Sequence, residues 1–313
     1  MKMLARILGG VVALLVVLGV LERVAPQPMA RGLVSLQRTS SGLELKKAQI
    51  PGFDIPYLEG GPAEGEPLVL VHGIGADKDN FDRAAMFLTP TMRVISIDLP
   101  GFGEASKPMD ADYGIPKQVE RLDQFLTALN IPKAHLGGNS MGGWIIASYA
   151  AAHPEKVSSL WLIDAAGVGT GKPSEVRTAY ESRGEFMLFS KTPEDFDRVL
   201  TTVMSKPPYL PYSVKHVISQ RAFADYDLHT RIFADLFKAA PQTILEPKVK
   251  GLAIPTLITW GAEDRATDVS GADVLHKLLP KSEVHVLEGI GHLPQLEASR
   301  PVAKRYLDFR AKL

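Results

Sequence analysis

Short, mostly apolar runs recur along the chain, and each one ends in a polar or glycine-rich turn. The runs cover residues 68–71, 94–97, 134–137, 160–163, 256–259 and 284–287. Such runs are typical of strands that are covered on both faces of a parallel sheet. Helical stretches alternate with them, which predicts an α/β fold with a mostly parallel sheet and helices on both faces. Active sites in such sheets form at the carboxyl ends of the strands, where the polar turns lie.

Two segments depart from this alternation. Residues 43–48 and 53–57 predict a pair of edge strands ahead of the first buried run. Residues 168–250 hold no buried strand run but contain ten of the 23 aromatic residues, which predicts an inserted helical cap, or lid. Its rings are expected to fill the cap's own core and, collectively, to line an apolar chamber. The core domain is then expected at 43–167 and 251–313.

The amino-terminal residues have another pattern. Two basic residues precede an uncharged apolar run over 7–21, which Glu22 closes. Three interpretations compete, namely a membrane anchor over residues 1–23, a cleaved secretory signal and a buried helix. The anchor, a single transmembrane helix, is favoured because no convincing small-x-small cleavage site is present. The leading positive charge predicts a single-pass protein of the inner (cytoplasmic) membrane with its catalytic domain on the periplasmic side, and secretion after signal cleavage is the alternative.

The predicted anchor has two further features. Ala5, Gly9 and Ala13 repeat at four-residue spacing, a small-residue face on which two anchors would pair into a homodimer. Residues 24–42 form a juxtamembrane connector, in which prolines interrupt the anchor and an amphipathic helix follows. That helix either covers the catalytic domain or lies on lipid, and the sequence leaves both open.

A strand-to-helix turn at 138–142 reads Gly-Asn-Ser-Met-Gly. The glycines allow a sharp turn in which Ser140 holds a strained backbone and exposes its Oγ at a helix amino terminus. A developing oxyanion near Ser140 would meet the free N–H of Met141 and the favourable end of the helix dipole. Alone, this pattern also fits an ordinary turn between a strand and a helix.

A serine nucleophile needs a base, and the base needs an anion that fixes its tautomer. His292 lies on a glycine-flexed loop directly after the last strand, and Asp264 follows the strand before it. We therefore expect a triad of Ser140, Asp264 and His292, while His72 is expected to be structural, its ring tying loops together. The alternative acids are Glu263, Asp268 and Asp164.

Five motifs in this order resemble those of the α/β-hydrolase superfamily, over the chain from about residue 43 to its carboxyl end. They lie at 72–75, 98–103, 138–142, 260–264 and 291–294. The resemblance implies an α/β-hydrolase fold, and it implies that the backbone N–H of Ile74 joins that of Met141 in an oxyanion hole. It also marks Asp164 as a second location of the acid in this superfamily.

Serine at the turn indicates acyl chemistry, because dehalogenases and epoxide hydrolases of this fold have aspartate there. The chain looks similar to bacterial membrane-anchored lipases and phospholipases A, so we expect a serine carboxylic-ester hydrolase that acts on lipid-like acyl esters. One alternative is a C–C bond hydrolase, although Leu293 stands where those enzymes typically have tryptophan. The others are a general small-ester esterase and a non-catalytic acyl-ligand-binding protein.

The composition excludes several classes of binding partner and of chemical site. The chain has 35 basic and 35 acidic residues, so no bulk charge favours nucleic acid. Cysteine is absent, which excludes a cysteine nucleophile, a thiolate metal site and a disulfide. We expect no cofactor and no metal, with an acyl ester or phospholipid as substrate and membrane lipid around the amino-terminal helix.

Overall fold

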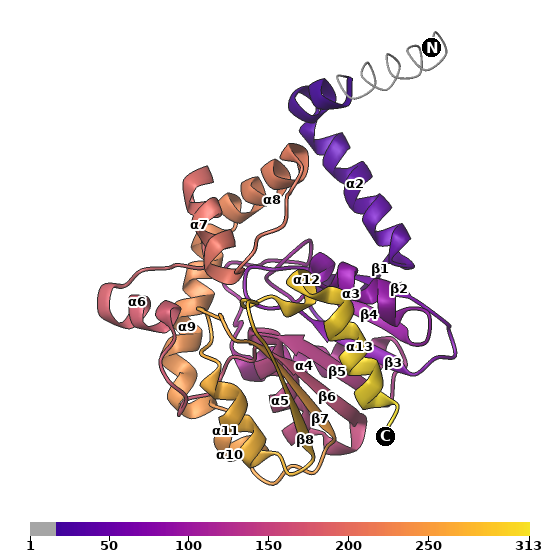
Figure 1. Cartoon of the computed structure of the whole chain (residues 1–313), viewed down its shortest axis with the longest axis vertical. Helices are drawn as coiled ribbons and strands as arrows, with labels where there is room; N and C mark the ends of the chain where they lie inside the picture. The colour runs from indigo at the N-terminus through magenta and orange to yellow at the C-terminus, as the bar shows by residue number, and fades with distance from the viewer. Residues whose placement is uncertain (1–16) are drawn as a thin grey trace.

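The computed structural model describes residues 17–313, which form an eight-stranded sheet. Figure 1 shows helices on both sides of this sheet and further helices beyond one end. The strand order is β1-β2-β4-β3-β5-β6-β7-β8. The strands are β1 (Leu43–Ile50), β2 (Phe53–Gly60), β3 (Pro67–Val71), β4 (Arg93–Ile97), β5 (Ala134–Asn139), β6 (Val157–Ile163), β7 (Thr256–Gly261) and β8 (Ser282–Leu287). All the predicted strand segments are therefore confirmed.

Only the first part of the sheet is antiparallel. The strands β1 and β2 pair as a hairpin, and β2 runs antiparallel to β4, as expected of edge strands. From β4 to β8 every pairing is parallel, so the carboxyl ends of these strands meet at one edge. The predicted mostly parallel sheet is confirmed, and its polar turns share that edge.

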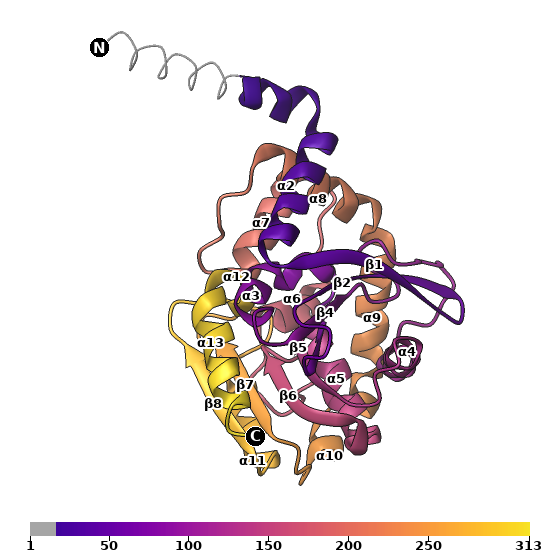
Figure 2. The same cartoon turned by 90° about the vertical axis from the view of Figure 1, so that its right-hand side faces the viewer.

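Side chains of β3 show how both faces of the sheet are covered. Leu68 and Leu70 belong to a core formed with the helices α3 and α13, whereas Val69 and Val71 pack in a core with α4, α5 and α11. Figure 2 shows α13 and α4 on opposite sides of the strands. The helices of this part are η1 (Lys78–Phe81), α3 (Asp82–Leu88), α4 (Ile115–Ala128), α5 (Met141–Ala152), η2 (Pro154–Lys156), α11 (Ser270–Leu278), α12 (Pro294–Glu297) and α13 (Ser299–Arg310).

Between β6 and β7 the chain forms helices and no strand, within the residues described. They are α6 (Glu175–Arg183), α7 (Pro193–Val203), α8 (Tyr212–Ala224), α9 (Tyr226–Thr243) and α10 (Glu246–Val249), and we call α6 to α9 the cap. Five of the aromatic rings pack on one another as a small cap core. They are Tyr180, Phe186, Phe189, Phe233 and Phe237.

The amino-terminal segment contacts the cap. Residues 17–24 are helical, and the helix α2 (Pro26–Ser40) packs against α8. The amphipathic helix predicted in the connector is therefore present, although Leu36 on it is exposed. Within residues 17–313 no helix is long and apolar enough to cross a bilayer. Most of the predicted anchor, including its small-residue face at 5, 9 and 13, lies outside the described residues.

Candidate active site

Ser140 stands between β5 and α5 in a strained conformation, with φ 56° and ψ −120°. A positive φ is uncommon for a residue with a side chain, and here the surrounding backbone fixes it. The N–H of Ser140 donates to the carbonyl of Ile163 at 3.0 Å, and its own carbonyl accepts the N–H of Ala166 at 2.9 Å. The turn predicted at this serine therefore has the expected geometry.

The glycine at position 142 allows this turn because the neighbouring strand passes so close. A Cβ on Gly142 would lie 2.0 Å from the carbonyl oxygen of Val71 in β3. A Cβ on Gly138 would lie 2.6 Å from the carbonyl carbon of Gly142. Neither approach is tolerable for a side chain, so the helix α5 can start this close to β3 only with glycine.

His292 and Asp264, which are 28 residues apart, come together at the carboxyl edge of the sheet. The Nδ1 of His292 lies 2.7 Å from Oδ2 of Asp264, and both side chains are buried. The Asp264 Oδ1 accepts the N–H groups of Ala266 and Thr267 at 2.7 and 3.0 Å, and its Oδ2 accepts the Thr267 hydroxyl at 2.7 Å. Burial raises the pKa of Asp264, but the His292 ring and these hydrogen bonds outweigh it, so that the pKa is lowered and the group is an anion.

The side chain of Asn139 links the serine turn to the main chain of His292. Asn139, next to the serine, donates its Nδ2 to the carbonyl of His292 at 3.0 Å, and it donates to Ile163 as well. In the described part of the chain no hydrogen bond joins the Ser140 hydroxyl to the His292 ring. Such bonds are often long in enzymes without substrate and tighten when the substrate binds.

Two backbone N–H groups beside Ser140 are available to a ligand. Ile74 and Met141 both line the cavity over the serine. Within residues 17–313, neither N–H donates to a protein acceptor. Met141 is also the first residue of α5, where the helix dipole favours negative charge. The two residues predicted for the oxyanion hole therefore lie on the same cavity as the serine.

The loop that carries Ile74 is fixed by His72, which is fully buried. Its Nε2 accepts the N–H of Leu99 at 3.0 Å, so the ring donates from Nδ1 to the carbonyl of Gly73 at 2.7 Å. Burial lowers the pKa of His72 to about 4, and the ring is neutral near pH 7. His72 ties the loops after β3 and β4 together, as predicted.

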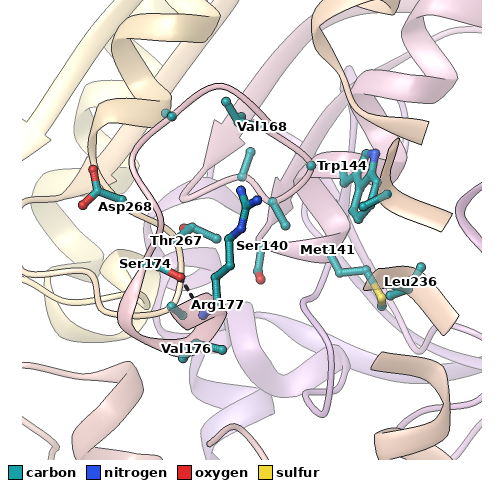
Figure 3. A pocket seen from close by; sticks show the side chains of 18 of the residues that line it. Ser140, Met141, Trp144, Val168, Ser174, Val176, Arg177, Leu236, Thr267 and Asp268 are labelled. Atoms are coloured by element: carbon teal, nitrogen blue, oxygen red, sulfur yellow. Dashed lines mark hydrogen bonds between the residues drawn. The ribbon is translucent and has the colours of Figure 1, made fainter. Parts of the chain in front are cut away.

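A cavity of about 430 Å³ opens between the strand edge and the cap. Figure 3 shows Ser140 within it, with Arg177 extending from α6 into the middle of the view. The walls are mostly apolar and include Trp144, Leu236 and Phe237. Some of the aromatic residues of the cap thus face the chamber that the sequence predicted, while others complete the cap core.

Sequence reasoning missed a buried ion network beneath the same loops. Lys78 is fully buried, and its Nζ lies 2.9 Å from Oδ2 of Asp98 and 2.7 Å from Oε2 of Glu104. A Cβ on Gly103 would lie 2.3 Å from the Asp98 carboxylate, so this glycine makes room for it. The 98–103 motif contained the signal, but Lys78 is remote from it in sequence.

The alternative acids lie at different distances from the histidine. Glu263 is exposed, and Asp268 accepts the N–H of Ser270 at the start of α11. Asp164 is buried, and one of its oxygens, one of Asp264 and a ring nitrogen of His292 all lie within 4.8 Å of one another. This trio is the one group with metal-binding spacing among the residues described, but the His292 nitrogen and the Asp264 oxygen are already bonded together.

A family model described as the alpha/beta hydrolase fold matches residues 66–299. The chain belongs to the α/β-hydrolase family. It is 38% identical to Lipase 1 of Psychrobacter immobilis over 90% of this chain and 88% of that one. It is 29% identical to the monoacylglycerol lipase of Mus musculus, over 88% of this chain and 85% of that one.

Solved structures of this family agree with these relatives. A membrane phospholipase A superposes with a TM-score of 0.88 at 40% identity, covering 100% of this chain and 99% of that one. A meta-cleavage product hydrolase from Pseudomonas fluorescens has a TM-score of 0.74 at 22% identity, covering 85% of this chain and 97% of that one. This likeness shows a shared fold alone. This α/β-hydrolase is a carboxylic ester hydrolase of the lipase and phospholipase type.

Proposed function

We propose that the protein hydrolyses the acyl ester of a membrane-derived lipid through an acyl-enzyme on Ser140. The observation that carries the proposal is the His292–Asp264 hydrogen bond at 2.7 Å beside a largely apolar cavity lined by Ser140. In the proposed cycle His292 takes the Ser140 proton as the oxygen attacks the ester carbonyl. Asp264 stabilises the resulting imidazolium, and water then cleaves the acyl-enzyme.

The oxyanion is assigned to the N–H groups of Ile74 and Met141. Both are already oriented by the loop at His72 and by the start of α5, so little reorganisation is needed as charge develops. Removal of one such donor in other acyl-transfer enzymes costs about 10²- to 10³-fold in rate.

The cavity supports an amphiphilic substrate. Its apolar wall, with Trp144 and Leu236, suits an acyl chain, whereas Lys172 and Arg177 at the cap side can face a polar head group. The name of the solved relative, a membrane phospholipase A, agrees with this substrate class.

Membrane attachment is the second part of the proposal. We infer that residues 1–23 span the inner membrane and hold the catalytic domain on its periplasmic side. Val17, Val20 and Val24 of the described helical segment are exposed, as lipid-facing residues would be. Retention of the full chain in carbonate-washed membranes, with protease access from the periplasm, would support this topology. A Gly9→Leu variant with unchanged oligomeric state in detergent would refute pairing through the anchor.

The function is tested with full-length protein in detergent. Labelling by a fluorophosphonate probe should occur in wild type and in Ser148→Ala, a control on α5, but not in Ser140→Ala.

The Asp264→Asn variant should lose about 10³-fold or more in kcat on p-nitrophenyl butyrate, because the wrong His292 tautomer is held. Phospholipid micelles should release fatty acid. Hydrolysis of the short ester without fatty acid release would leave a general esterase, and absence of labelling would leave an acyl-binding protein.

A further inference from the structure

Asp164 has a strained backbone conformation and is fixed by hydrogen bonds. It follows β6 with φ 45°, in the left-handed region that residues with side chains rarely adopt. Its N–H donates to the carbonyl of Thr259 at 2.9 Å. The carboxyl Oδ1 accepts the N–H of Gly261 at 2.9 Å. Strained backbone of this kind persists only where its surroundings fix it, and it is concentrated at functional sites.

The other carboxyl oxygen of Asp164 is unusual. Oδ2 is buried and has no hydrogen-bond partner in the described part of the chain. If Asp164 were ionised, a buried charged oxygen would have no partner among the described residues, which is strongly unfavourable. A second negative charge would also lie beside Asp264, because the two carboxyl groups approach within 4.8 Å. Two buried carboxyl groups this close favour a state in which one of them is protonated.

The hydrogen bonds decide which of the two residues holds that proton. Asp264 accepts from two backbone N–H groups, from Thr267 and from His292, all of which favour its anion. Asp164 accepts from Gly261 alone. Burial and the neighbouring Asp264 charge raise the pKa of Asp164 well above its ordinary value. The proton therefore belongs on Asp164.

We propose that Asp164 is a positioning residue, which stays protonated at Oδ2 and donates that proton to the Asp264 carboxylate. The pair then carries one negative charge, which Asp264 presents to His292. This inference rests on the proposed function, in which Asp264 orients His292. It gives Asp164 a role as a neutral donor in place of the role of alternative acid.

A neutral donor can be replaced by an amide but not by a hydrocarbon. In Asp164→Asn the side-chain carbonyl can still accept the N–H of Gly261, and the amide N–H can donate to Asp264. In Asp164→Leu both bonds are lost at similar volume. We measure kcat/KM against pH on p-nitrophenyl butyrate with the full-length protein in detergent, and Asp273→Asn, an exposed carboxylate on α11, is the matched control.

We expect Asp164→Asn to keep kcat/KM within about threefold of wild type and to leave the acid limb of the profile, which reports the essential base, unmoved. Asp164→Leu should lose about 10- to 100-fold, as for a hydrogen bond to a charged group. Its acid limb should also move to higher pH, because Asp264 without its donor holds more charge against His292. Infrared spectra of wild type should contain a buried carboxylic-acid carbonyl band that is absent from Asp164→Asn.

Each contrary result overturns the inference. An acid limb that moves to lower pH in Asp164→Asn would mean that Asp164 is an anion in wild type. If the acid limb of the kcat/KM profile does not move in Asp164→Leu, the role of Asp164 is purely structural. Activity that survives Asp264→Asn but is abolished by adding Asp164→Asn would make Asp164 the acid itself. Failure of the proposed function is distinguishable, because wild type would then hydrolyse no ester or would be unaffected by Ser140→Ala.

Discussion

Protonation of His72 in the unfolded chain should lower the free energy of unfolding in mild acid. The ring is neutral because Nε2 accepts the N–H of Leu99, and burial lowers its pKa to about 4 against about 6.5 in an unfolded chain. As the pH falls below about 6.5 the unfolded state takes up a proton that the folded state refuses, so the free energy of unfolding falls. At about pH 4.5 this loss amounts to about 2.5 kcal/mol.

The calculation is tested by comparing wild type with His72→Asn at about pH 7 and about pH 4.5, using denaturant unfolding in detergent. The variant should be less stable at neutral pH, but the difference from wild type should shrink by about 2.5 kcal/mol in acid. The stability difference between wild type and variant is compared at the two pH values because other groups also titrate in this range. Burial raises the pKa of Asp98 to about 6, so protonation of Asp98 stabilises the folded state as the pH falls, in both proteins. The exposed His276→Asn is the control. A stability difference for His72→Asn that is equal at the two pH values would refute the reasoning.

Two further predictions concern stability. Lys78→Met should lower the free energy of unfolding by about 3–5 kcal/mol, because it leaves the buried Asp98 carboxylate without its cation. The double variant with Asp98→Asn should recover most of this loss, and a double variant as unstable as the single one would contradict the pairing. Gly142→Ala should lower the melting temperature severely, because its Cβ would lie 2.0 Å from a main-chain oxygen of β3. Its matched control is Gly32→Ala, which has open space on α2 and should gain up to about 1 kcal/mol; similar melting temperatures for the two variants would refute the steric argument.

The sheet could be predicted from the sequence because its signal is local. Apolar runs such as 68–71 mark buried strands, and the turns after them carry polar residues that the parallel topology brings to one edge. The same logic selected His292 and Asp264, which the structure places 2.7 Å apart between Nδ1 and Oδ2. Position relative to a strand end was therefore enough to predict that these two side chains lie close together, although it did not exclude Asp164 as the acid.

The role of Asp164 could not be read in the same way. Its position at the end of β6 made it an alternative acid, which is as far as a strand-end rule can go. Its proton depends on how many donors reach each carboxylate, and four donors reach Asp264 against one for Asp164. A count of this kind requires the positions of backbone N–H groups such as that of Gly261, and residue types do not give these positions.

Long-range polar contacts were likewise beyond the sequence, and they determine how the amino-terminal segment meets the cap. The Glu22 carboxylate before α2 accepts the N–H of Ser213, the second residue of α8, at 2.7 Å, while α2 and α8 each bind an aspartate at the start of η1. They are the hydrogen bond from Ser213 to Glu22 and the ion pairs Arg38–Asp79 and Arg221–Asp77. Each charged partner alone has the sequence signature of a solvated surface charge, because nothing local distinguishes it. Together they join the segment next to the proposed anchor, the cap and the loop that follows Ile74, so that the amino-terminal helix is tied to the loop after β3 as well as to the cap.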